Sequence, residues 1–178
     1  MRKIILIGGD LASGKSTYSY YLRDKYDLTL INKDTLKEII GDMYYACCRE
    51  ENIKLSRLSF EIIKYFIKVT KCNIIIESNF KDYEMEELKQ FLPNNDILSL
   101  HFYGDDKLLR ERFLKRLPTR HYVHQAQDFT NIDDMIKTQQ DLRKVEYIGE
   151  VVKVDVGRFD DLAKDVELTR KIEDFLSK

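Results

Sequence analysis

IILIGGDLASGKST occupies residues 4–17 and joins a short apolar run to a glycine-rich loop. From Gly9 to Ser16 the stretch fits the pattern G-x-x-x-x-G-K-[S/T] at every fixed position. By average composition, a chance match in such a chain has a frequency on the order of one in a hundred or less. Helical spacing follows the loop, so the stretch predicts a buried strand, a phosphate-binding loop and a helix in immediate succession.

The residue types in this loop suit phosphate chemistry. Glycines allow consecutive backbone N–H groups to turn toward phosphate oxygens, and the following helix offers its positive N-terminal end. We expect Lys15 to bind the β- and γ-phosphates and the Ser16 hydroxyl to ligate Mg²⁺. Thr17 is either a second hydroxyl near the α-phosphate or part of the first helical turn, and the alternative for the whole loop is a glycine turn that binds nothing. The predicted nucleotide-binding residues of the loop are Gly9, Asp10, Leu11, Ala12, Ser13, Gly14, Lys15, Ser16 and Thr17.

Apolar runs of strand length alternate with longer stretches of helical spacing along the chain. The apolar runs are residues 3–7, 28–32, 73–77, 97–103 and 151–156, and the helical stretches are 14–27, 34–42, 53–71, 83–92, 105–117, 132–144 and 160–176. Such alternation predicts right-handed crossovers and a mainly parallel five-stranded sheet between two layers of helices. We therefore predict an α/β, three-layer P-loop NTPase fold made by a single domain, residues 1–178, with ligands beyond the carboxyl ends of the strands.

Composition limits the classes of partner. Thirty Lys and Arg against 31 Asp and Glu give a net charge of -1, so any contact with nucleic acid must be local. The apolar run at the start ends at Gly8, too early for a secretory signal, and no segment approaches the roughly 20 apolar residues that span a bilayer. The three cysteines, Cys47, Cys48 and Cys72, fit no metal spacing, and we expect them to be small buried side chains. We expect a cytoplasmic protein without membrane contact, and the sequence indicates no particular oligomeric state.

The chain lacks the other motifs of a switch GTPase. Residues 32–35 resemble the base-recognition element N-K-x-D, but Thr35 stands where the Asp belongs and the segment comes too early. No Walker B aspartate stands out either, because the apolar run at 73–76 ends at Glu77. Glu77 either holds Mg²⁺ through water or orients a catalytic group, or it simply caps the strand.

A carboxylate, Asp34, follows the second predicted strand. It is either the N-cap of the next helix, accepting hydrogen bonds from the first turn, or a catalytic group that accepts a proton from an acceptor hydroxyl. We favour the catalytic interpretation because the loop already places phosphate nearby. Lys37 lies one turn further along the same helix face, where it either holds an anionic acceptor or faces solvent.

Basic residues gather in a later helical stretch. An arginine that contacts the transferring phosphoryl group can raise the rate of the transfer roughly 10³- to 10⁵-fold. A mobile lid that carries such arginines also excludes water. Arg112 and Arg116 are four residues apart and share one helix face. We predict a helical lid at about residues 110–130, and the alternative is a solvated helix face. The basic residues of this stretch are Arg110, Arg112, Lys115, Arg116 and Arg120.

Together these segments resemble the small P-loop kinases of the AAA_33-type family, which includes polynucleotide 5'-kinase domains, chloramphenicol phosphotransferase and zeta-toxin-like kinases. The resemblance covers nearly the whole chain and is carried by residues 5–17, 32–37 (NKDTLK), 76–80 (IESNF), 120–124 (RHYVH) and 154–157 (VDVG), with Arg112 and Arg116. RHYVH is similar to the R-H-x-x-H lid element of these enzymes. VDVG is similar to the turn that lies beside adenine.

The resemblance implies ATP with Mg²⁺ as the phosphoryl donor. It implies that Asp34 is the general base and that Lys15, Arg116 and Arg120 clamp the transition state. The further binding positions that it implies are Arg112 and Gly157 for the nucleotide and Lys37 and Asn79 for the acceptor.

Two positions depart from the family pattern. The usual Pro-Gly of the lid element is Tyr122-Val123 here. The frequent Arg three residues after the base is Lys37, which lacks the bidentate fork of arginine. His121 and His124 have no carboxylate or third ligand at a spacing that would complete a metal site, so we do not expect them to bind metal.

We therefore expect an ATP- and Mg²⁺-dependent kinase that transfers the γ-phosphoryl group to a hydroxyl of a small molecule or of a polynucleotide 5' end. The expected partners are the nucleotide and a hydroxyl-bearing acceptor, with a nucleic-acid end among the candidates. One alternative is a regulatory ATP-binding module with slow ATP hydrolysis and no acceptor. Another is a structural α/β domain whose loop binds nothing.

Overall fold

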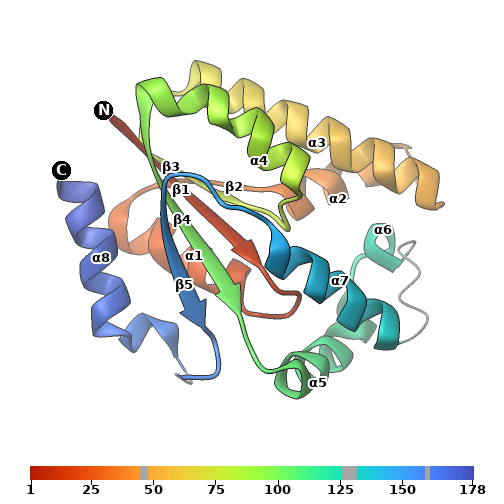
Figure 1. The fold of residues 1–178 in the computed structure, drawn as a ribbon. Helices are drawn as coiled ribbons and strands as arrows, with labels where there is room; N and C mark the ends of the chain where they lie inside the picture. Colours follow the sequence, from red (N-terminus) through yellow and green to blue (C-terminus); the bar gives the residue numbers. More distant parts are fainter. Residues whose placement is uncertain (45–47, 126–131, 159–160) are drawn as a thin grey trace.

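A computed structural model describes residues 1–44, 48–125, 132–158 and 161–178, and Figure 1 shows their fold as a ribbon. Residues 126–130 of the predicted lid and Cys47 lie outside the described residues. One sheet contains five strands: β1 (Arg2–Gly9), β2 (Thr29–Asn32), β3 (Ile74–Glu77), β4 (Asn95–Tyr103) and β5 (Glu150–Asp155). Their order is β2-β3-β1-β4-β5 and every pairing is parallel, so the predicted parallel sheet is confirmed.

The described residues form eight α-helices that alternate with or follow these strands. The helices are α1 (Lys15–Tyr26), α2 (Lys33–Tyr44), α3 (Arg49–Val69), α4 (Asp82–Leu88), α5 (Asp106–Arg116), α6 (Tyr122–Gln125), α7 (Ile132–Lys144) and α8 (Val166–Ser177). Short 3₁₀ turns cover Lys89–Asn94, Leu117–Thr119 and Leu162–Lys164. No helix in the described part of the chain combines the length and the apolar character that a membrane crossing requires.

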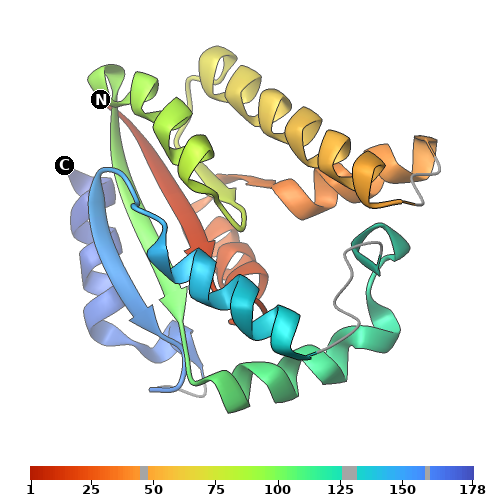
Figure 2. The same cartoon turned by 45° about the vertical axis from the view of Figure 1, so that its right-hand side comes forward.

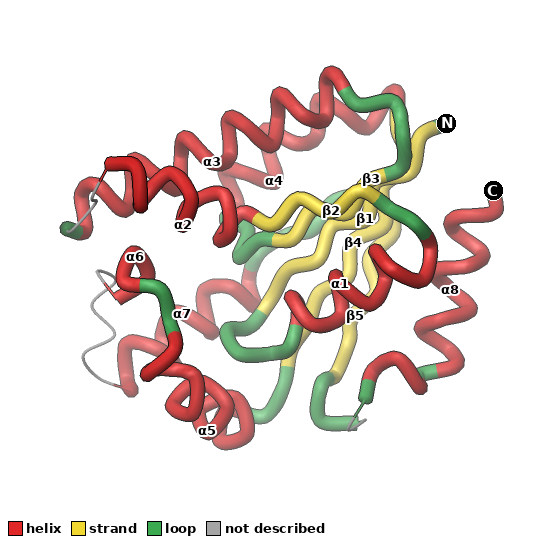
Figure 3. Tube along the Cα trace, turned by 180° about the vertical axis from the view of Figure 1, so that it is seen from behind, coloured by secondary structure: helices red, strands yellow, loops and turns green. Residues whose placement is uncertain are grey.

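The sheet lies between two helical layers, which confirms the three-layer prediction. Ile5 and Ile7 of β1 pack into a core with α1 and α8, and the view from behind shows these two helices on that face (Figure 3). Ile4 and Leu6 of the same strand pack into a second core with α3 and α4. Because successive strand residues point to opposite faces, a central strand buried on both sides must be apolar throughout.

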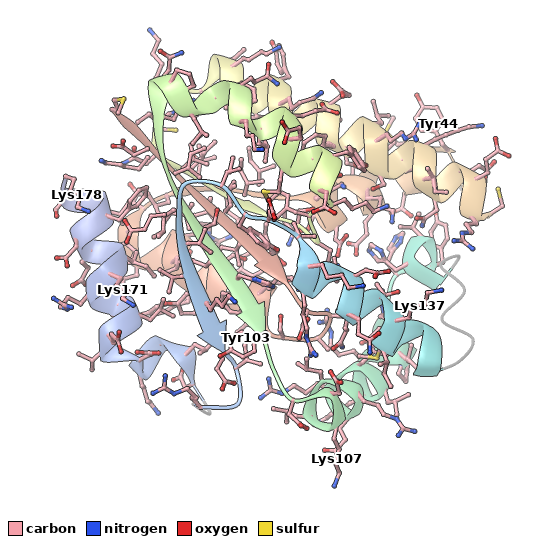
Figure 4. The ribbon with its side chains drawn as sticks, in the orientation of Figure 1. Tyr44, Tyr103, Lys107, Lys137, Lys171 and Lys178 are labelled. Atoms are coloured by element: carbon pink, nitrogen blue, oxygen red, sulfur yellow. The ribbon has the colours of Figure 1, made fainter. Side chains whose placement is uncertain are left out.

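The segments that follow β1, β2 and β4 gather at the carboxyl end of the sheet. They are the glycine-rich loop, α2 and α5, and Figure 2 turns this end of the molecule, with α6 and α7, toward the reader. In Figure 4, Tyr103 marks the end of β4, and Lys107, in the first turn of α5, points away from the sheet. The fold thus places the predicted ligand-binding segments at one end.

Three predictions about local structure were wrong. The helix expected over 83–92 ends at Leu88 and continues as a 3₁₀ turn containing Pro93, which has no N–H to donate. The helix expected from residue 160 begins at Val166, because the Asp165 side chain caps it by accepting from the Leu168 N–H at 3.0 Å. Cys48 and Cys72 are exposed rather than buried.

Candidate active site

The glycine-rich loop adopts the predicted strand-loop-helix arrangement. Gly9 has a φ of 119°, and a Cβ atom there would lie 2.0 Å from the Phe102 carbonyl oxygen of β4. Only glycine allows the two backbones to approach this closely. Gly14 has a φ of 83° and is the N-cap of α1, so the N-terminus of α1 begins directly at Lys15.

Lys15 lies buried beneath the loop. Its Nζ donates to the carbonyl oxygens of Gly9 at 3.2 Å and Asp10 at 2.5 Å. The Ser13 hydroxyl donates to the same Asp10 carbonyl at 2.7 Å, which closes the loop on itself. Burial lowers the pKa of Lys15, and the nearby carboxylates of Glu77 and Asp34 oppose that change.

Glu77, at the end of β3, is held against the start of α1. The Ser16 hydroxyl donates to Oε1 at 2.7 Å, and Ser19 and Asn32 donate to Oε2 at 2.9 Å and 2.5 Å. Burial raises the pKa of Glu77, while the Ser16 hydrogen bond and the charge of Lys15 oppose that change. A hydroxyl beside a carboxylate offers the oxygen ligands that Mg²⁺ prefers, so the residues present fit this ion.

Asn32 is a site residue that the sequence reasoning missed. Its Oδ1 accepts from the Thr35 N–H at 2.9 Å, so Asn32 caps α2 while its amide nitrogen bonds Glu77. The N-cap alternative for Asp34 is therefore wrong, and Asp34 lies exposed in the first turn of α2. An asparagine directly before a run of helical spacing was the available signal.

Two cavities adjoin the loop. A smaller one of about 210 Å³ brings together most residues predicted for catalysis, metal and acceptor: Lys15, Ser16, Asp34, Glu77, Asn79, Arg116 and Arg120. A larger one of about 890 Å³ is lined by Ala12, Ser13, Gly14, Ser16, Thr17, Arg112, Arg116 and Val156 among others. Arg116 therefore lies at the boundary of both cavities.

Three of the predicted nucleotide-binding residues, Gly9, Asp10 and Gly157, line neither cavity. The Asp10 side chain lines neither cavity, because it is buried and bonded to Arg143. Gly157 follows Val156 and donates its N–H to Asp155 at 2.9 Å, one residue away from the lining of the larger cavity.

Two arginines of the predicted lid line the smaller cavity: Arg116 is the last residue of α5, and Arg120 follows the 3₁₀ turn beyond it. Arg116 is exposed, and its positive charge reaches Lys15, whose pKa it lowers further. The Arg120 guanidinium lies 4.9 Å from the centre of the Phe113 ring. Burial lowers the pKa of Arg120, and the charge of Asp34 opposes that change, so these two side chains are close enough to interact.

Tyr122 and Val123, which stand at the predicted Pro-Gly position, attach residues 120–124 of the predicted lid to α2 and α3. The Tyr122 hydroxyl donates to the Gly41 carbonyl at 2.7 Å. Val123 is fully buried against Gly41 and Leu55, and the Asn52 amide donates to the Val123 carbonyl. The departure from the pattern thus produces a packed contact.

The two histidines of RHYVH bond to carboxylates that the sequence reasoning did not anticipate. His121 Nε2 lies 3.1 Å from Asp42 Oδ1, and His124 Nε2 lies 2.9 Å from Glu38 Oε1. Glu38 and Asp42 are four residues apart on α2, so they share one helix face. Burial lowers the pKa of His124, and the charges of Asp34 and Glu38 oppose that change.

The two predicted acceptor residues are placed differently: Asn79 lines the smaller cavity with Asp34, whereas Lys37 lines neither cavity. Lys37 is only 3% exposed, so the solvent-facing alternative is wrong. Burial lowers the pKa of Lys37 to about 8, with Asp34 acting in the opposite direction. Asn79 lines the smaller cavity, and its buried Oδ1 has no hydrogen-bond partner among the described residues.

The parallel sheet, the glycine-rich loop and the Ser16–Glu77 contact define a P-loop NTPase fold. No protein-family model and no curated protein matches the chain. Solved structures do match it. A Chloroflexus aurantiacus protein that is provisionally named a kinase has a TM-score of 0.76 and 22% identity, over 96% of this chain and 97% of that chain.

Two further structures are similar over nearly their whole length. A shikimate kinase from Bacteroides thetaiotaomicron has a TM-score of 0.63 and 14% identity, over 98% of both chains. A gluconokinase from Sinorhizobium meliloti has a TM-score of 0.60 and 19% identity, over 99% of this chain and 98% of that chain. At these identities the similarity establishes the fold.

Proposed function

We propose that the chain is a cytoplasmic, single-domain kinase of the AAA_33 type that uses ATP and Mg²⁺ to phosphorylate a hydroxyl group. The observation that carries the proposal is the smaller cavity, which holds Lys15 and Ser16 of the loop together with Asp34, Arg116 and Arg120. The fold that the chain shares with solved kinase structures supports a phosphotransferase. A loop that only binds ATP would need neither the carboxylate nor the two arginines.

The donor nucleotide would lie across the loop, with its phosphates at the N-terminus of α1. Lys15 would bind the β- and γ-phosphates, and the larger cavity, with Thr17 and Arg112, would hold the rest of the nucleotide near Gly157. Ser16 and Glu77 would hold Mg²⁺, which would supply positive charge against the phosphates.

Asp34 would act as the general base. As the acceptor oxygen bonds to the γ-phosphorus, the Asp34 carboxylate takes the hydroxyl proton, and the bond from phosphorus to the bridging oxygen breaks to release ADP. Lys15, Arg116 and Arg120 stabilise the negative charge on the transferring group. The lid contact through Val123 excludes water, which limits hydrolysis of ATP.

Lys37 favours an acceptor that carries negative charge near the reacting hydroxyl. A lysine that is almost fully buried gives up hydration, and an anionic ligand would compensate it. The amide oxygen of Asn79 would accept a hydrogen bond from a second hydroxyl. Sugar acids, sugar phosphates and the terminal nucleotide of a polynucleotide all combine these groups.

The proposal is tested by incubating the purified chain with Mg²⁺ and γ-labelled ATP in the presence of pooled acceptors. The pools are sugars and sugar acids, nucleosides, antibiotics and 5'-hydroxyl oligonucleotides. We expect label in one pool, with most turnover directed to that acceptor rather than to free phosphate. Slow phosphate release alone, with clear stabilisation by ATP, would instead identify the regulatory module.

A further inference from the structure

Arg143, near the end of α7, connects three segments of the active-site end. Its Nε donates to both carboxylate oxygens of Asp10 at 3.1 Å and 2.9 Å, and its Nη2 donates to Asp10 Oδ2 at 2.6 Å. The same Nη2 donates to the Gly104 carbonyl at 2.8 Å and to Asp106 Oδ1 at 2.7 Å. The hydrogen bonds to Asp10 raise the pKa of Arg143, so the guanidinium stays charged.

Asp10 transmits this contact to the phosphate-binding loop. Its carboxylate is fully buried and accepts a further hydrogen bond from the Gly104 N–H at 3.2 Å. Its backbone carbonyl accepts from the Nζ of Lys15, and its N–H donates to the Phe102 carbonyl at 2.8 Å. The orientation of Asp10 is therefore fixed on one side by Arg143 and determines, on the other side, where the amine of Lys15 lies.

Asp106 transmits the contact to the arginine-bearing helix. Asp106 lies in the first turn of α5, whose N-cap is the neighbouring Asp105, so its carboxylate is free to bond Arg143. Arg116 lies at the other end of α5, and a displacement of the first turn would move it as part of the same rigid helix. Arg143 thus contacts the first turn of α5, the helix that carries Arg116 at its other end.

We propose that Arg143 is a positioning residue that fixes the phosphate-binding loop and α5 relative to each other, so that Lys15 and Arg116 meet at the same phosphoryl group. The proposal rests on the proposed kinase function. Such a residue can affect the rate strongly, because a misplacement of the reacting groups by about 1 Å can lower the reaction rate roughly 10²-fold. If the ion pair only stabilised the fold, its removal would lower the melting temperature, and the effect on kcat would not depend on Arg116.

The test compares Arg143→Met in the wild-type background and in an Arg116→Ala background. We expect roughly a 10- to 100-fold fall in kcat when Arg116 is present, and a fall of about threefold or less when it is absent, because the misplaced group is then already missing. Arg143→Lys, which keeps the charge but not the fork, should retain an intermediate kcat. Lys144→Met, at an exposed neighbour on α7 that pairs with Asp141, should leave kcat unchanged.

Because Arg143→Met leaves a buried carboxylate without its partner, the double variant Asp10→Asn/Arg143→Met provides a version without the buried charge. This double variant should fold, but its affinity for MgATP should be roughly tenfold weaker than that of the wild type. ATP-dependent shifts in melting temperature measure this affinity. Equal fractional losses of kcat in both Arg116 backgrounds, or wild-type MgATP affinity in the double variant, would overturn the positioning role. If the wild-type chain transferred no phosphoryl group, the kinase proposal would be contradicted instead. The MgATP affinity of the double variant would still test the positioning role of Arg143.

Discussion

The phosphate-binding loop and the lid segment reach the same cavity, but different contacts hold them. The loop connects β1, the central strand of the sheet, to α1, and Glu77 and Phe102 of the two flanking strands bond to it directly. The lid residues 120–124 touch α2 and α3 at the edge of the molecule, through one buried valine and a few side-chain hydrogen bonds. The loop is therefore expected to keep its geometry, and we predict that residues 120–124, as part of the proposed lid, separate from α2 and α3 more easily.

Removing the charge that the lid side supplies should have the largest effect. Arg116→Ala should lower kcat for phosphoryl transfer roughly 10³-fold or more, because the equatorial oxygens lose their arginine. Steady-state transfer of label from ATP measures this, with Arg110→Ala, an exposed arginine of α5 that lines neither cavity, as the matched control. Equal rates for the two variants would show that the lid side contributes no catalytic charge.

Removing the proposed base, Asp34 of α2, tests the helix between the loop and the lid residues. Asp34→Asn should lower kcat roughly 10²- to 10⁴-fold, because the asparagine amide cannot accept the hydroxyl proton at this position. Since Asn32 rather than Asp34 caps α2, the melting temperature should stay close to that of the wild type. Asp27→Asn, an exposed carboxylate at the end of α1, controls for loss of surface charge. A large loss of stability without loss of kcat would mean that Asp34 is structural.

The lid contact is tested with a single methyl group. In Gly41→Ala the new Cβ would lie 2.4 Å from Val123 Cγ2, so the lid must move away from α2. Overpacking of this kind costs about 1–3 kcal/mol, which corresponds to a roughly 5- to 150-fold loss of the docked population. We expect transfer to fall and the share of free phosphate to rise, as measured by product analysis.

A second substitution distinguishes the lid contact from an effect on α2 itself. Val123→Ala in the Gly41→Ala background removes the clash and should restore part of the transfer activity. Alanine also favours the helix over glycine by about 1 kcal/mol, so weakening of α2 does not account for a loss. If the double variant is no more active than Gly41→Ala, the lid account is wrong.

The smallest expected effect is a pH dependence at Lys37. Because its pKa is lowered to about 8, Lys37 is charged below that pH and becomes neutral above it. If it binds an anionic group, kcat/KM for the acceptor should fall roughly fivefold between pH 8 and pH 9, since only the charged form binds. In Lys37→Met, kcat/KM should not fall between pH 8 and pH 9. If the variant keeps the wild-type pH profile, the fall is due to the titration of another group.

The difference between the two regions also explains what the sequence could predict. The strand, loop and helix from Lys3 to Tyr26 are contiguous, so their residue types and spacing predict both structure and phosphate binding. The alternation of elements likewise predicts the sheet and its layers. Asp34 was singled out because its segment follows a strand of that sheet.

The contacts that complete the site join residues far apart in the chain. Asp10 and Arg143 are separated by 133 residues, and Glu38 and His124 by 86. No local pattern in one sequence links such pairs, because only the folded topology brings them together. Likewise, the burial of Lys37 and Val123 depends on how α2, α3 and the lid pack, so their residue types alone did not indicate it.

The most direct test of the central claim follows both products of γ-labelled ATP with the wild type and with Asp34→Asn, using the acceptor found in the pooled screen. We predict that the wild type delivers most label to the acceptor. We predict that Asp34→Asn loses that product by roughly 10²-fold or more while its MgATP affinity stays within about threefold of the wild type. Transfer by Asp34→Asn at the wild-type rate, or a wild type that releases only free phosphate, would contradict the account.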